Sequence, residues 1–172
     1  FNADSFLVLS ILSLALIPFQ ASYEEVVFRG YFAQGVGAWT KSRWLVILIP
    51  SILFGLMHSF DPDVSKYGFW VMMPQYILFG LMFGLVTVLD DGIELAMGAH
   101  AANNIFISIV ITAKGSSFQP SSLFTQQITN PTIDLFVLML MGLAFVAFLS
   151  YRYKWNYSIL KQKIVPDKIE LA

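Results

Sequence analysis

Long apolar runs separated by short polar breaks dominate the pattern along this chain. We expect helices over residues 5–20 and 22–38, with Pro18 bending the path and Ser22 capping the second piece. The other expected membrane spans cover residues 44–59, 69–89, 93–113 and 132–151. A membrane helix needs about 20 apolar residues. The pattern therefore predicts an all-α, polytopic transmembrane helical bundle with about five to six membrane helices.

Composition supports lipid as the solvent of this bundle. Hydrophobic residues make up 57% of the chain and charged residues only 12%, whereas soluble domains carry about 25% charge. The net charge of -1 gives no sign of a nucleic-acid partner, and the absence of cysteine excludes disulfides and cysteine metal sites. We therefore expect the lipid bilayer to be a partner of this chain.

Basic residues set the expected orientation and the domain division. Five of them fall in residues 152–172, at Arg152, Lys154, Lys161, Lys163 and Lys168. Because positive charge accumulates on the cytoplasmic side, we expect a membrane domain at residues 1–151 and a basic cytoplasmic tail at 152–172. Counting the spans back places Lys41 and Arg43 on the same side as the tail.

The chain begins with Phe1 and not with Met, so we also expect further segments upstream.

Three ionisable side chains, Glu24, Glu25 and Arg29, continue the first apolar run. One charge near the middle of a membrane helix costs roughly 2.5–3.5 kcal/mol, which favours a functional role over a structural salt-bridge cluster. Residues four apart share a helix face, so Glu25 and Arg29 can form an ion pair. Glu24 is rotated by about 100° and is expected to face a cavity, where it can take a proton from water.

Two later helices carry polar pairs with the same spacing. Phe54 and His58 are four residues apart, as are His100 and Asn104. From the rise of a helix, Glu24, His58 and Asn104 lie roughly 18–22 Å from the inner ends of their spans, and His100 about 12 Å. We therefore expect these groups to meet inside the membrane. Two glycines four residues apart, at Gly80 and Gly84, also predict a close approach between helices.

Together these motifs resemble the CPBP family of intramembrane proteases, which includes the Rce1-type CAAX prenyl endopeptidases and bacteriocin-processing or immunity-associated relatives. The matching residues are Glu24-Glu25-x-x-x-Arg29, Phe54-x-x-x-His58 and His100-x-x-x-Asn104. The resemblance implies an intramembrane endopeptidase that cleaves a membrane-associated peptide or protein, of the CAAX type or in leader-peptide processing. The implied catalytic residues are Glu24, His58, His100 and Asn104, supported by Glu25, Arg29 and Phe54.

Two chemistries are compatible with these residues. In one, Glu24, His58 and His100 bind Zn²⁺, which lowers the pKa of a bound water to about 7. In the other, Glu24 is the general base, while His58, His100 and Asn104 orient the water and stabilise the developing charge. A competing hypothesis is a non-catalytic membrane scaffold or bacteriocin-immunity protein that uses the same cavity for binding. Either protein would reside in a bacterial cell membrane.

Overall fold

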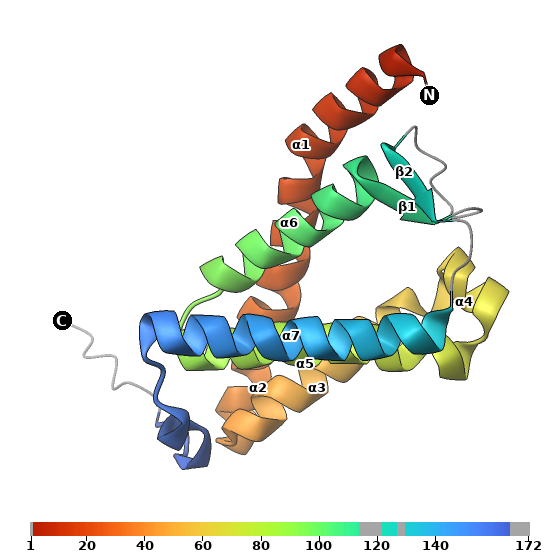
Figure 1. The fold of residues 1–172 in the computed structure, drawn as a ribbon. Helices are drawn as coiled ribbons and strands as arrows, with labels where there is room; N and C mark the ends of the chain where they lie inside the picture. The colour runs from red at the N-terminus through yellow and green to blue at the C-terminus, as the bar shows by residue number, and fades with distance from the viewer. Residues whose placement is uncertain (1, 114–121, 127–129, 166–172) are drawn as a thin grey trace.

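The computed structural model describes residues 2–113, 122–126 and 130–165, and helices account for most of them (Figure 1). The first half of the chain forms α1 (Ala3–Glu25), η1 (Val26–Phe32), α2 (Ala33–Thr40), α3 (Arg43–Met57), η2 (His58–Phe60) and α4 (Pro62–Tyr67). The second half forms α5 (Phe69–Asp90), α6 (Glu94–Ile109), α7 (Pro131–Tyr153) and η3 (Tyr157–Lys161). The expected helical membrane bundle is confirmed.

The predicted break between residues 20 and 22, with Ser22 as a helix cap, is wrong. Helix α1 continues through both residues, and the Ser22 carbonyl accepts the backbone N–H of Val26. Ser22 is therefore inside the hydrogen-bond ladder and caps nothing. The change comes later, where η1 has π-helical geometry before the α-helix resumes in α2. A continuous path satisfies the backbone polar groups, which have no water to bind inside a bilayer.

Four helical stretches in the described residues are long and apolar enough to cross a membrane: Ala3–Thr40, Arg43–Phe60, Phe69–Asp90 and Pro131–Tyr153. The expected number was larger for two reasons. The two predicted N-terminal pieces are one continuous helical path, and α6 has only 16 residues. The prediction of helix up to residue 113 is also wrong, because Ile111–Ala113 forms strand β1, which pairs in parallel with β2 (Phe124–Gln126).

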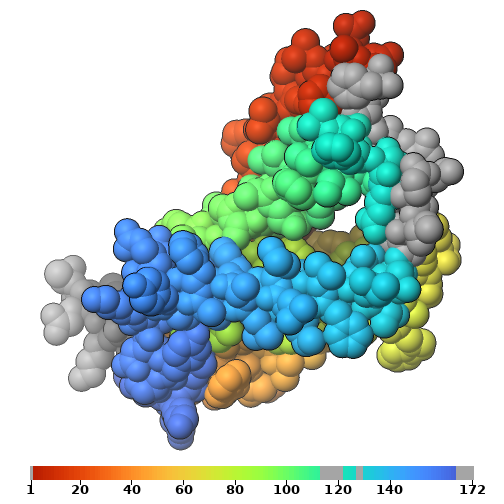
Figure 2. Space-filling model, in the orientation of Figure 1, coloured from red at the N-terminus to blue at the C-terminus, as the bar shows by residue number. Residues whose placement is uncertain are grey.

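The helices pack as two main pairs. Helix α6 packs against α1, and α3 packs against α5, while α7 runs alongside α5, in front of it in Figure 1 (see also Figure 2). A cluster of Phe83, Val86, Ala96 and Leu149 joins α5, α6 and α7. Large apolar side chains elsewhere on α1 and α7 are exposed, including Phe19 and Leu140. Such outer faces are expected of helices whose solvent is lipid.

The predicted glycine contact is present between α5 and α3. A Cβ atom built on Gly80 would lie 2.9 Å from the Cα atom of Ser51, so only glycine permits this spacing. The Gly84 position is also close to α3, with Ile47 Cγ2 3.4 Å from the corresponding Cβ. Close backbone approach at small residues is a common way for membrane helices to associate. Here it brings the Gly80 carbonyl beside the polar cluster described below.

The described part of the C-terminal tail folds back onto the end of the bundle that carries Asp90 and the Lys41–Ser42 turn. The indole N–H of Trp155 donates to Asp90 over 3.0 Å, and the Ile164 backbone N–H donates to the Lys41 carbonyl over 3.0 Å. Ser42 also forms a bridge with Lys163. The tail, the Lys41 turn and the α5–α6 turn thus share one end, as the span count predicts. Residues 166–172 of the predicted tail, with Lys168, lie outside the described residues.

Candidate active site

The imidazole of His100 on α6 lies between two carboxylates of α1. Its Nδ1 atom is 2.7 Å from Glu25 Oε1, and its Nε2 atom is 3.7 Å from Glu24 Oε2. An ionised carboxylate only accepts hydrogen bonds, so the shorter contact puts a proton on Nδ1 and turns Nε2 toward Glu24. The packing of α6 along α1 produces this contact across 75 positions of sequence. The two glutamates therefore hold opposite sides of one ring.

Arg29 fixes Glu25 from the other direction. Its Nη1 atom donates to Glu25 Oε1 over 3.1 Å, and its Nη2 atom donates to the Gly80 carbonyl over 3.1 Å. The guanidinium also lies 4.6 Å from the ring centre of Phe54 and 5.7 Å from that of Phe83. The predicted Glu25–Arg29 ion pair is thus confirmed. Both side chains are almost fully buried, at 0% and 2% exposure, and a buried charge requires such partners.

Glu24 is less enclosed than Glu25. Its side chain is 14% exposed. Its Oε1 atom accepts a hydrogen bond from the Gln20 amide, whereas its Oε2 atom is buried without a hydrogen-bond partner among the described residues. The Oε2 atom and His100 Nε2 lie 3.7 Å apart, so one oxygen about 2.8 Å from each would bridge them. Because Oε2 is covered in this structure, that oxygen enters only when a side chain moves aside. This arrangement suits the activation of a water molecule.

Asn104 joins the same group one helical turn beyond His100. Its amide nitrogen lies 3.4 Å from Gln20 Oε1, and its carbonyl accepts the Asn103 amide over 3.1 Å. Gln20 thus connects Asn104 with Glu24. The Asn103 amide is directed at the Asn104 side-chain carbonyl, so Asn103 helps to hold Asn104 in place.

His58 approaches the cluster through aromatic rings. It is the first residue of η2, and its Nδ1 atom lies 2.8 Å from the carbonyl of Phe54. A carbonyl only accepts, so Nδ1 donates, and Nε2 is the nitrogen without a hydrogen-bond partner among the described residues. The Phe54 ring lies 4.8 Å from the His58 ring and 5.9 Å from the His100 ring. In the described part of the chain, no hydrogen bond links His58 with Glu24, His100 or Asn104.

The local helix geometry explains how one short stretch supplies Glu24, Glu25 and Arg29. Glu24 and Glu25 end α1, and Arg29 lies in the π-helical η1 that follows. A π-helix has a wider turn than an α-helix, and single π turns often occur at functional sites. The change in winding keeps the Glu25–Arg29 pair and places Phe28 against Phe54, with ring centres 5.4 Å apart.

The zinc hypothesis requires Glu24, His58 and His100 to converge on one point. Among the described residues, no group of three or more His, Cys, Asp or Glu side chains is arranged to hold a metal ion. His100 instead uses Nδ1 for Glu25, and the contacts of His58 run through Phe54. The side-chain arrangement does not fit the expected ligand set, so no step below is routed through a metal.

Several residues of the cluster were not expected. Gln20 is four residues before Glu24, and this spacing is the signal that could have identified it. Two aromatic contacts had no such signal in the sequence. The Phe83 ring stacks on His100 with ring centroids 5.2 Å apart, and the Tyr76 ring stacks on His58 with centroids 4.6 Å apart. Both lie on α5, which supplies no predicted site residue. Only the packed structure shows their proximity.

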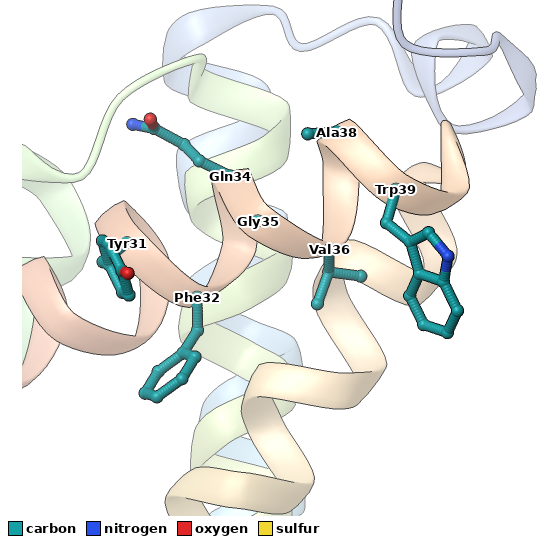
Figure 3. A pocket seen from close by; sticks show the side chains of 7 residues that line it. All are labelled: Tyr31, Phe32, Gln34, Gly35, Val36, Ala38 and Trp39. Carbon is teal, nitrogen blue, oxygen red and sulfur yellow. The ribbon is translucent and has the colours of Figure 1, made fainter.

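A hollow on the outer face of η1 and α2 is separate from this cluster (Figure 3). It has a volume of about 580 Å³. Its lining includes Phe32, Val36 and Trp39, and Trp39 is 81% exposed. None of the predicted site residues lines it. It is an open and mostly apolar depression, so the candidate active site remains the Glu24–His100 cluster.

Comparison with known proteins gives the family. The chain is 36% identical over 159 residues to a protein of Bacillus subtilis (strain 168) described as "Uncharacterized protein YyaK". The match covers 92% of this chain and 53% of YyaK, so the chain spans about half the length of this curated relative. No solved structure matches the chain.

The family model for type II CAAX prenyl endopeptidase Rce1-like proteins matches residues 5–106, a region that contains all three motifs and the whole polar cluster. The chain therefore belongs to the Rce1-like family of CAAX-type proteases, as an integral membrane protein.

Proposed function

We propose that this protein hydrolyses a peptide bond of a membrane-associated protein or peptide, with Glu24 as general base. One observation carries the proposal: the His100 ring is held by Glu25 at Nδ1, and its other nitrogen faces the unpaired Oε2 atom of Glu24. A buried carboxylate oxygen beside an oriented imidazole can bind and deprotonate a water molecule. Membership of a protease family supports this use of the cluster.

The reaction starts with water bound between Glu24 and His100. Glu24 Oε2 takes a proton, and the water oxygen forms a bond to the carbonyl carbon of the peptide while the C=O electron pair moves onto oxygen. When this intermediate collapses, the C–N bond breaks, and the proton on Glu24 moves to the departing nitrogen. The products are a carboxylic acid and an amine. Positioned proton transfer of this kind typically accelerates a reaction by about 10²–10⁴-fold.

Asn104 and His58 are the candidate stabilisers of the oxyanion. The Asn104 amide lies in the cluster beside Gln20, and a small shift would direct an N–H toward a substrate oxygen. The Nε2 atom of His58 becomes a donor when the ring is protonated. Donors aimed at the developing charge are worth about 10²–10³ in rate each. Glu25, Arg29 and Phe54 hold the imidazole and the helix ends in place.

The substrate we propose is a segment held at or in the bilayer, either a CAAX-type C-terminus or a leader peptide. The site supports this, because its glutamates lie on the Ala3–Thr40 candidate membrane span, whose outer face carries exposed apolar side chains. We further propose that the protein spans a bacterial cell membrane with its C-terminal tail in the cytoplasm. The clustering of Lys41, Arg43 and the tail lysines at one end of the bundle supports this orientation.

Cleavage and binding of a reporter peptide, measured in parallel, test the proposal. The Glu24→Gln variant keeps the shape of the side chain but loses the base. It is expected to bind the peptide and to cleave it at least about 10³-fold more slowly than wild type. The matched control is Asp4→Asn, an exposed acid in the first turn of the same helix, which should cleave normally. Cleavage by Glu24→Gln at the wild-type rate would refute the role of Glu24, and unchanged binding with no cleavage by wild type would favour the scaffold hypothesis.

Metal content tests the zinc alternative in the same preparations. A glutamate-based reaction predicts full activity in wild-type protein that contains no bound zinc after dialysis against a chelator. One zinc per chain, lost together with activity and restored together with it, would contradict the proposal. It would then require Glu24, His58 and His100 to converge as ligands.

A further inference from the structure

A cavity of about 570 Å³ lies at the end of the bundle where α2, α3 and α5 meet the described tail. We call it the basal pocket. Seven residues carry its polar lining: Arg29, Gln34, Lys41, Arg43, Thr87, Asp91 and Glu94. Ile164 of the tail closes part of it. The pocket adjoins the candidate active site through Arg29 but contains none of the groups that we propose to touch substrate.

Three residues that line this pocket also carry buried hydrogen-bond donors without partners among the described residues. The Nε atoms of Arg43 and Arg29 and the hydroxyl of Thr87 are buried without a hydrogen bond among the described residues. Arg29 is itself only 4% exposed. Buried polar groups in folded proteins are nearly always hydrogen-bonded, so each exception needs an explanation. The donor atoms themselves are covered in this structure, so a ligand in the cavity reaches them only after their side chains rotate. Unpaired donors on three lining residues favour a ligand that accepts hydrogen bonds, and a phosphate group is such an acceptor.

The position of the pocket along the membrane normal identifies the source of that phosphate. The Ala3–Thr40 span ends beside it, the Arg43–Phe60 span starts there, and the Phe69–Asp90 span also ends there. Trp39 and Trp44 flank this level and are 81% and 57% exposed. Exposed tryptophans at the ends of spans mark the membrane interface, where lipid headgroups lie.

The charges of the pocket select the type of headgroup. Arg29 is neutralised by its ion pair with Glu25. The remaining cations, Lys41 and Arg43, are matched by Asp91 and Glu94, and none of these four side chains forms an ion pair within the described part of the chain. A balanced lining favours a ligand with one charge of each sign over a free phosphate or an anionic lipid.

We propose that the basal pocket binds the headgroup of an aminophospholipid of the phosphatidylethanolamine type. Arg43, Lys41 and Thr87 bind the phosphate, and Asp91 and Glu94 accept hydrogen bonds from the primary ammonium group. A primary ammonium offers three donors, whereas the quaternary ammonium of phosphatidylcholine offers none. This proposal is independent of the proposed hydrolysis, since its measurement requires no cleavage.

Native mass spectrometry of the purified protein, titrated with short-chain lipids, tests the site. Phosphatidylethanolamine is expected to bind at least about fivefold more tightly than phosphatidylcholine or phosphatidylglycerol, and inorganic phosphate should not displace it. Equal affinity for the three lipids would overturn the proposal. Displacement by inorganic phosphate at matched concentration would also overturn it, because it would identify a site for free anions.

Two variants locate the binding. Arg43→Gln and Thr87→Val should each weaken phosphatidylethanolamine binding by at least about fivefold. The control, Lys161→Gln, changes an exposed basic residue near the same end that does not line the pocket, and it should bind as wild type does. If Arg43→Gln fails to fold, the nearly isosteric Thr87→Val variant decides the question. Wild-type affinity in Thr87→Val would refute the site.

Discussion

The two histidine regions of this protein differ in how the fold holds each ring. His100 is 4% exposed, bonds to Glu25 over 2.7 Å and stacks on Phe83. His58 is half-buried at the end of α3, bonds to the backbone of its own helix and stacks on Tyr76. Charge therefore fixes the first ring and packing fixes the second. In the sequence both have the same appearance, one histidine with a motif partner four residues away.

This difference assigns different duties to the two residues. A ring held between carboxylates can share protons with them, which suits His100 to the activation of water. A ring held by a carbonyl and a neighbouring aromatic keeps its orientation without a charged partner, which suits His58 to binding a substrate oxygen. The three predictions below test this contrast, and we give them from the largest expected effect to the smallest.

Replacing each histidine by alanine should separate their contributions to stability. His100→Ala removes a partner from a fully buried Glu25 carboxylate and should lower the free energy of unfolding by about 1–3 kcal/mol. His58→Ala removes one ring contact and should cost about 0.5–1.5 kcal/mol. Both variants should lose cleavage. Unfolding in mixed micelles measures the difference, and equal losses of stability would contradict the contrast between the two regions.

Gln20→Ala should reduce cleavage without changing stability. The Gln20 amide donates to Glu24 and accepts from Asn104, so its loss frees both groups to turn. Loss of a hydrogen bond to a charged group costs about 1.5–3 kcal/mol. Because Gln20 is exposed, water replaces this bond in the folded protein, so we expect the loss to appear as a kcat that is about tenfold lower. Gln34→Ala, an exposed glutamine farther along the same helical path, is the control. A change in KM alone would show that Gln20 binds substrate and does not position Glu24.

Tyr76 should have the smallest effect, confined to the His58 region. Tyr76→Leu removes the ring that stacks on His58, whereas Tyr76→Phe keeps it. Because such a ring pair is worth about 0.5–1.5 kcal/mol, Tyr76→Leu should slow cleavage about 2–10-fold, and Tyr76→Phe should be close to wild type. Equal activity of the leucine and phenylalanine variants would show that stacking does not orient His58.

Helical spacing and membrane length predicted much of this arrangement. The Glu25–Arg29 pair follows from a four-residue separation, and the Gly80 contact follows from two glycines on one face. The π-helical turn of η1 left no signal, because its residues, Val26–Phe32, suit an α-helix equally well. The continuous path from residue 20 through Ser22 was missed, since the polar residues there suggest a break, whereas a membrane helix keeps its backbone groups bonded. The placement of His100 between the two glutamates, bonded to Glu25 and 3.7 Å from Glu24, depends on how α6 packs along α1, which one sequence does not specify.

The most direct test of the central claim is a double-mutant cycle on Glu24 and His100. Cleavage rates are measured for wild type, Glu24→Gln, His100→Gln and the double variant in the same membranes. If the two residues activate one water together, the double variant should be no slower than the slower single variant, because groups that act as a unit are strongly non-additive. Multiplied losses in the double variant, or a single variant that keeps more than about a tenth of wild-type activity, would contradict the account.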